Sequence, residues 1–267
     1  MTPATASAPV LVLLREADPV VSGAPLVVLM PHSGCNSGVF LPVAQAMTGP
    51  SAVVAVDYPG HGGRFIEAPA PDVFVLGAEI ADAVAALAPA EVVLFGHSFG
   101  SIVGFEVARG LAEREVRVRR LVASSCVSPH AMAAETRAVH RVSDRVLLDL
   151  LVGHGGLDAD LLAEPELLEV MLPVIRHDTM LGELHRPVPG AVVEVPVTAV
   201  GGSEDPTVSR TDLAGWGKCT TAECTVEFVP GGHFHVMEHP QNIAALLTAA
   251  AHRDAGAPLE NTGGPTS

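Results

Sequence analysis

Short apolar runs alternate with amphipathic stretches along most of this chain. The apolar runs predict strands over residues 10–14, 25–30, 52–56, 91–95, 120–123, 193–200 and 226–229. Apolar residues at helical spacing predict helices over 72–87, 102–111 and 243–251. The strand runs are nearly continuous, without polar alternation, which is typical of a parallel sheet buried on both faces. The pattern therefore predicts a mostly parallel, doubly wound α/β domain.

One segment departs from this alternation. From about residue 129 to 189 the pattern is helical, and no strand is predicted. We expect a helical lid that covers the carboxyl edge of the sheet, where ligands bind in such folds. Residues 1–252 would then form a single domain. The tail 253–267 is rich in Gly, Pro and Thr and is expected to be disordered.

Composition narrows the possible partners. Hydrophobic residues make up 48% of the 267, enough for a sizeable core, and the net charge is −15. This acidity argues against nucleic acid and anionic membranes as partners. No apolar run reaches the roughly 18 residues that suit a membrane span, and the N-terminus lacks the pattern of a signal peptide. The four cysteines have no metal-ligand spacing and are expected to be reduced thiols of a cytoplasmic protein.

The motif Gly96-His97-Ser98-Phe99-Gly100 lies between a predicted strand and a predicted helix. In a sharp strand-to-helix turn, small residues two positions before and after a serine let the chain close and present the hydroxyl. The N-terminus of the following helix favours developing negative charge. The alternative is a glycine-rich turn with an incidental serine. We expect Ser98 to be a nucleophile.

A serine nucleophile needs a base, which we expect after the last predicted strand. His233 follows Gly231-Gly232 directly after that strand and is the preferred base. His235 and His239 are competitors, although each is more simply interpreted as a surface or helix-start histidine.

The third member should be an acid after the strand 193–200. Asp205 and Glu204 both qualify, and Asp205 is preferred because Asp-Pro starts a turn that can hold the carboxylate. The alternative is a helix-capping aspartate. The order Ser98, Asp205, His233 is that of the α/β-hydrolase fold, in which the acid orients the imidazole and stabilises its cation.

The rest of the site is predicted less directly. The backbone N–H of Phe99 and that of Ser33, or of a neighbour of Ser33, are the expected oxyanion-hole donors. His32 is a candidate pocket residue, although such a histidine more often orders its loop. Since only 1 Trp, 1 Tyr and 8 Phe are present, we expect Leu, Val and Met to line the pocket, including Met171 and Met180. No phosphate-binding loop, metal cluster or flavin motif is found, so no cofactor or metal is expected.

From about residue 25 to 245 the chain resembles the type II thioesterases, the discrete α/β-hydrolases that accompany polyketide synthases and nonribosomal peptide synthetases. The matching motifs are Pro31-His32-Ser33-Gly34, Tyr58-Pro59-Gly60 with Arg64, Gly96-His97-Ser98-Phe99-Gly100-Ser101, Leu172-Pro173 with Arg176 and Asp178, Gly202 with Asp205-Pro206, and Gly231-Gly232-His233-Phe234.

The resemblance implies hydrolysis of acyl groups from the phosphopantetheine thiol of an acyl carrier or peptidyl carrier protein, for editing or product release. Ser98 would attack the thioester with His233 as base, and water would then release the acyl group. The chain departs from the family pattern at Ser33 and Cys35, where Ala and Gly are usual, and at His61, His177 and His235. We hypothesise that these residues make the pocket entrance more polar than usual.

Carrier proteins are commonly acidic, so an acidic enzyme needs a local basic patch to bind them. Arg137, Arg141 and Arg145 are spaced i, i+4, i+8, as on one face of a lid helix, and are candidates for docking. A solvated surface is the alternative.

Three other functions remain open. A carboxylesterase or lactone hydrolase would use the same scaffold, because fold does not fix function. A cyclising or transferring release enzyme would use another acceptor for the acyl group. A non-catalytic carrier-binding protein is the remote alternative, because binding alone does not need all three of Ser98, Asp205 and His233.

Overall fold

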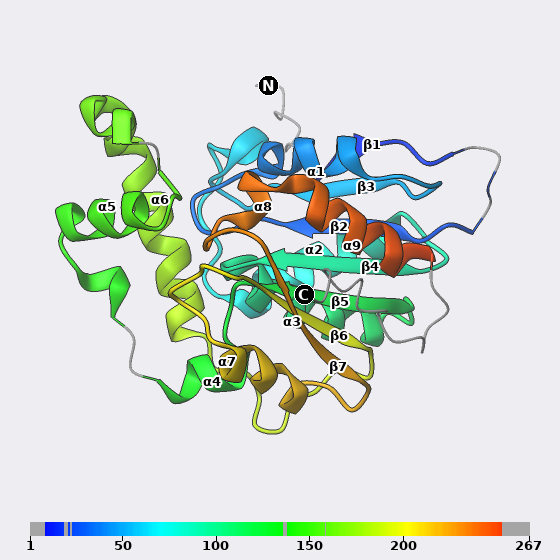
Figure 1. Ribbon diagram of the computed structural model, residues 1–267. Coiled ribbons are helices and arrows are strands. Elements are labelled where there is room, and N and C mark those ends of the chain that lie inside the picture. The colour runs from blue at the N-terminus through cyan, green and yellow to red at the C-terminus, as the bar shows by residue number, and fades with distance from the viewer. Residues whose placement is uncertain (1–8, 19–20, 22, 136–137, 158, 253–267) are drawn as a thin grey trace, which may run out of the picture.

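The computed structural model describes residues 9–18, 21, 23–135, 138–157 and 159–252. In this part of the chain seven strands form one sheet in the order β1-β3-β2-β4-β5-β6-β7 (Figure 1). They are β1 (Leu11–Arg15), β2 (Leu26–Met30), β3 (Val53–Val56), β4 (Val92–His97), β5 (Val118–Ser124), β6 (Val197–Gly202) and β7 (Cys224–Val229). Only the pairing of β1 with β3 is antiparallel in this sheet, so the predicted mostly parallel sheet is confirmed.

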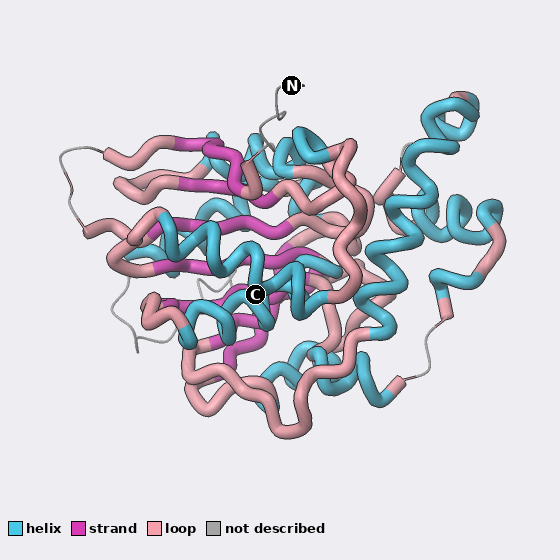
Figure 2. The backbone as a smooth tube through the Cα atoms, turned by 180° about the vertical axis from the view of Figure 1, so that it is seen from behind, coloured by secondary structure: helices cyan, strands magenta, loops and turns pink. Residues whose placement is uncertain are grey.

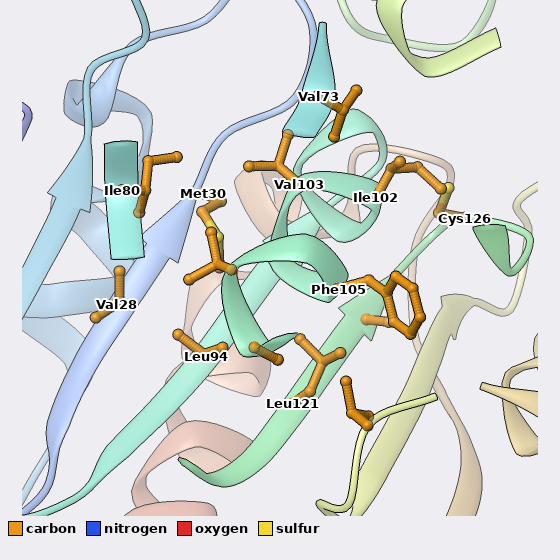
Figure 3. Close-up of a cluster of buried hydrophobic side chains, with 14 of the residues drawn as sticks. Val28, Met30, Val73, Ile80, Leu94, Ile102, Val103, Phe105, Leu121 and Cys126 are labelled. Atoms are coloured by element: carbon orange, nitrogen blue, oxygen red, sulfur yellow. The ribbon is translucent and has the colours of Figure 1, made fainter. Parts of the chain in front are cut away.

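Helices cover both faces of the sheet, as Figures 1 and 2 show from opposite sides. One face carries α2 (Val73–Ala86) and α3 (Phe99–Glu113), and the other carries α1 (Leu41–Ala46) and α9 (Pro240–His252). Along β2, Val28 and Met30 belong to the first hydrophobic cluster, part of which Figure 3 shows, whereas Val27 and Leu29 belong to the second. Because both faces are buried, every position of the strand is apolar.

The shorter elements lie in the connections. They are the 3₁₀ turns η1 (Ser37–Phe40) and η2 (Gly62–Arg64), α7 (Arg210–Ala214), the 3₁₀ turn η5 (Gly215–Lys218) and α8 (His235–Glu238). The sequence did not predict α1, because six residues with a proline in the first turn show no helical period. Strand β6 begins at Val197 rather than at 193, since Pro196 has no N–H to donate to a ladder. Val193 forms only an isolated bridge with Thr220.

A helical insertion, residues 125–196, separates β5 from β6. Its described residues form α4 (Pro129–Ala134), η3 (Val139–Arg141), α5 (Asp144–Gly153), η4 (Ala159–Ala163) and α6 (Pro165–Leu184). Helices α5 and α6 stand beside the carboxyl ends of the central strands (Figure 1). The predicted tail 253–267 lies outside the described residues. Within the described ranges, no helix has the length and apolarity that crossing a membrane requires.

The prediction that three arginines share one helix is wrong for the two that the structure describes. Arg141 ends η3, whereas Arg145 lies in α5. The break falls at Ser143, whose side chain accepts the Val146 N–H and so starts a new helix. Arg137 lies outside the described residues.

Two glycines let β4 turn sharply into α3. A Cβ on Gly96 would lie 2.1 Å from the Gly100 carbonyl oxygen, and a Cβ on Gly100 would lie 2.1 Å from that of Met30. Between them Ser98 has φ 52° and ψ −118°, a conformation that costs a non-glycine residue free energy. Its N–H donates to the Ser124 carbonyl at 2.7 Å. The turn is therefore fixed by backbone contacts with both neighbouring strands.

We predict that Gly100→Ala lowers the free energy of unfolding by about 3 kcal/mol, because the methyl group would force β2 and α3 apart. Urea unfolding followed by circular dichroism measures the change. Gly153→Ala is the matched control, since a Cβ there meets nothing within 4 Å. Equal unfolding midpoints for the two variants would contradict this account of the turn.

Candidate active site

Three side chains from different loops meet at the carboxyl edge of the sheet. Ser98 Oγ lies 3.2 Å from His233 Nε2, and His233 Nδ1 lies 3.0 Å from Asp205 Oδ2. The Asp205 side chain is fully buried, whereas Glu204 is exposed. Of the candidate acids, the structure therefore brings Asp205 to the histidine.

The charge of Asp205 fixes where the His233 proton lies. Burial raises the pKa of this carboxyl, but the hydrogen bond and charge of His233 and two bonds from Thr207 outweigh it, so the pKa falls to about 2. An ionised carboxylate can only accept, so Nδ1 of His233 carries the proton. In the neutral imidazole, Nε2 then faces Ser98 with a free lone pair.

Thr207 completes this arrangement and was missed from the sequence. Its backbone N–H and its hydroxyl both donate to Asp205 Oδ1, at 2.8 and 2.6 Å. Its Oγ1 also lies 2.8 Å from His233 Nδ1. The signal was present, because a threonine two residues after an aspartate suits an Asx turn that holds the carboxylate.

A cavity of about 270 Å³ opens beside Ser98. Its wall includes both predicted oxyanion-hole residues, Phe99 and Ser33, and also His32. Phe99 begins α3, so the N-terminus of a 15-residue helix points at the site. The remaining lining is largely apolar and comes from α3, the helical insertion and the loops after β6 and β7.

The predicted pocket residues Met171 and Met180 are not among the lining residues. On α6 the cavity is lined by Ile175, Asp178, Thr179, Gly182 and Glu183, a single face of the helix. Met180 points from another face and packs against the main hydrophobic cluster. Met171 lies on the same face as Ile175 but one turn beyond the end of the cavity.

The two competing histidines lie elsewhere. His235 is completely buried, so its interpretation as a surface residue is wrong, although it does begin α8. Its Nε2 lies 3.1 Å from Ser124 Oγ, and that hydroxyl lies 2.9 Å from His97 Nδ1. Burial lowers the pKa of His235 to about 4 and that of His97 well below its ordinary value, so both rings pack as neutral groups. His239 is half-buried at the end of α8.

Asp178 ties the helical insertion to two loops, the one that contains Ser33 and the one that contains His61. Asp178 of α6 accepts the Gly34 N–H at 2.8 Å and bonds His61 Nε2 at 2.9 Å. Burial lowers the pKa of His61, but the hydrogen bond and charge of Asp178 outweigh this, and the net pKa is raised. Sequence reasoning noted His61 only as a departure from a family pattern, because nothing local shows its distant partner.

No group of three or more His, Cys, Asp or Glu side chains in the described part of the chain could hold a metal ion.

Comparison with known proteins identifies the family to which this chain belongs. The thioesterase domain model matches residues 25–250. Thioesterase PikA5 of Streptomyces venezuelae is 31% identical over 84% of this chain and 79% of its own. Phenyloxazoline synthase MbtB of Mycobacterium tuberculosis is 32% identical over 84% of this chain, which spans only 16% of MbtB. The structure of BorB, a type II thioesterase from the borrelidin biosynthetic cluster, superposes with a TM-score of 0.81 at 30% identity, covering 93% of this chain and 100% of BorB.

The molecule is an α/β-hydrolase, as the sequence predicted. The chain belongs to the thioesterase family, so it is a hydrolase that acts on thioester bonds. The predicted resemblance to the type II thioesterases is likewise confirmed.

We predict that the ion pair between His61 and Asp178 stabilises the fold in a pH-dependent way. Since Asp178 raises the pKa of His61, the contribution is complete below the unfolded pKa of about 6.5 and is lost as pH rises through the higher folded value. His61→Gln should therefore cost more stability at about pH 5.5 than at about pH 9. Urea midpoints at both pH values measure this, with His252→Gln, at an exposed position, as the control. A cost that grows with pH would contradict the assignment.

Proposed function

We propose that this protein is a type II thioesterase that hydrolyses acyl groups from the phosphopantetheine arm of acyl carrier or peptidyl carrier proteins, in the cytoplasm. The observation that carries the proposal is the chain of contacts from Ser98 to His233 to Asp205, in which Ser98 and His233 line a largely apolar cavity. A serine hydroxyl, a neutral imidazole and a buried carboxylate in this order suit acyl transfer.

Acylation would proceed as follows. Ser98 Oγ attacks the thioester carbonyl carbon while His233 Nε2 takes the hydroxyl proton. The imidazolium that forms is stabilised by Asp205. When the tetrahedral intermediate collapses, the C–S bond breaks and the pantetheine thiolate takes the proton from His233. The acyl group is then an ester of Ser98.

Deacylation repeats these steps with water as the nucleophile. His233 takes a proton from water, the new C–O bond forms at the carbonyl carbon, and Ser98 leaves with the proton. We assign stabilisation of the oxyanion in both steps to the backbone N–H groups of Phe99 and Ser33, supported by the N-terminus of α3. The helical insertion serves as the lid, because α5 and α6 supply much of the cavity wall.

Docking of the carrier is assigned to Arg141 and Arg145. Both side chains are exposed, and the only ion pair described for Arg145, a contact of 3.9 Å with Asp149, is itself exposed and weak. The opposite face of α5 lines the cavity through Leu147 and Leu150, so a carrier on this surface would sit close to the site. By contrast, Arg117 lies at the amino edge of the sheet and pairs with Glu91.

We expect Ser98→Ala to reduce thioester hydrolysis at least about 10³-fold, because no other hydroxyl is positioned beside His233 Nε2 in the described structure. Thiol release from an acyl-phosphopantetheine carrier protein measures the rate. Ser203→Ala, at an exposed serine, is the control and should retain wild-type activity.

Hydrolysis of an oxygen ester with no turnover of the carrier thioester would favour a carboxylesterase. Thiol release without free acid would favour a cyclising or transferring enzyme. No turnover of either substrate would favour a carrier-binding protein.

Reversing both docking charges, by Arg141→Glu with Arg145→Glu, should raise KM for the carrier-bound thioester about tenfold and leave KM for a small pantetheine thioester unchanged. Steady-state kinetics with both substrates measure the difference. Arg117→Glu, which reverses one charge at the amino edge of the sheet, is the control. An equal effect on the two substrates would show that these arginines do not bind the carrier.

A further inference from the structure

Two buried polar side chains lie on either side of Ser98. Strand β4 runs between β2 and β5, with Met30 opposite Gly96 and His97 opposite Ser124. The loop after β2 carries His32, and the residue after β5 is Ser125. Both line the same cavity as Ser98. Polar groups therefore flank the position of the reacting carbonyl from both neighbouring strands.

Ser125 is held rigidly against the nucleophile turn. The carbonyl of the preceding residue accepts the Ser98 N–H at 2.7 Å, and the N–H of Ser125 itself donates to Val200 at 2.8 Å. Its φ is 49°, a left-handed conformation that a serine adopts only at a cost in free energy. Ser125 is 2% exposed, and its hydroxyl has no hydrogen-bond partner among the described residues.

The side chain of His32 is also buried without a hydrogen-bond partner in the described structure. His32 is 5% exposed, and neither of its ring nitrogens has a hydrogen-bond partner in the described part of the protein. Burial and the charge of His233 lower its pKa to about 3, so the ring is neutral and offers one donor and one acceptor. Unpaired buried polar groups are costly, and in a cavity wall a ligand can supply the missing partners.

The rest of the cavity wall limits which part of a ligand can carry the groups that hydrogen-bond Ser125 and His32. Ile102, Val127, Leu147 and Ile175 present apolar surface to the cavity. The polar side chains that α6 adds to the wall, Asp178, Thr179 and Glu183, already have hydrogen-bond partners within the protein. A saturated hydrocarbon chain would satisfy that surface but would leave the polar groups beside Ser98 unpaired. Since Ser125 adjoins the nucleophile turn, it can reach only the carbons nearest the thioester carbonyl.

We propose that the preferred acyl group carries a hydroxyl substituent on its first or second carbon after the carbonyl. In this account Ser125 is a specificity-determining residue that hydrogen-bonds the substituent, and His32 supplies a second contact from the opposite side. The inference rests on the proposed function, because it takes Ser98 as the nucleophile.

The test compares kcat/KM for pantetheine thioesters of one chain length, namely butyryl, 2-hydroxybutyryl and 3-hydroxybutyryl. We expect the wild type to prefer one hydroxyacyl thioester over butyryl by about tenfold, the scale of one good hydrogen bond. Ser125→Ala should bring that ratio close to one. Ser125→Gly removes the same hydroxyl and also relaxes the left-handed backbone, so it should abolish the preference as well if the hydroxyl is its cause.

Ser203→Ala is the control and should keep the wild-type ratio. If the wild type hydrolyses all three thioesters equally, or if both Ser125 variants keep the preference, the inference is overturned while the proposed function stands. Hydrolysis of none of the three, including butyryl, would overturn both.

Discussion

The close approach of β2, β4 and α3 at the Ser98 turn is the constraint on which the site depends. Gly96 and Gly100 leave no space for a side chain, so the turn cannot relax without separating the strands. The strained backbone of Ser98 is tolerated because the central strands β2 and β4 are completely buried around it. This rigidity holds the hydroxyl in one place, to which the other groups can be matched.

The remaining groups reach that place through the order of the strands. Asp205 follows β6 and His233 follows β7. The two segments approach closely because Gly202 has no side chain: a Cβ there would lie only 2.1 Å from the Gly232 carbonyl oxygen. Asp178 joins α6 to the loop after β2, so the cavity wall and the site are mechanically linked. Parallel strands thus bring residues distant in sequence to one edge, as expected for this class of sheet.

The sequence predicted those parts of the site whose residues are close together along the chain. The turn around Ser98 was predictable because strand, glycines and helix are contiguous, but Asp205 could be preferred over Glu204 only on turn chemistry. Contacts between distant segments have no signal in the local sequence, so the ion pair of His61 and Asp178 was missed. The local sequence also did not show which face of each helix lines the cavity. The position of Met171 depends on where the cavity ends, and the arginine spacing concealed the helix start at Ser143.

The central claim is that His233 and Asp205 activate Ser98 as a nucleophile. Labelling with a fluorophosphonate probe, followed by peptide mass mapping, tests it most directly, because the probe reacts with activated serines and remains attached. The account predicts a single adduct on Ser98, lost in His233→Ala although the serine is still present. Thioester turnover with Ser98 unlabelled, or equal labelling in His233→Ala, would contradict it.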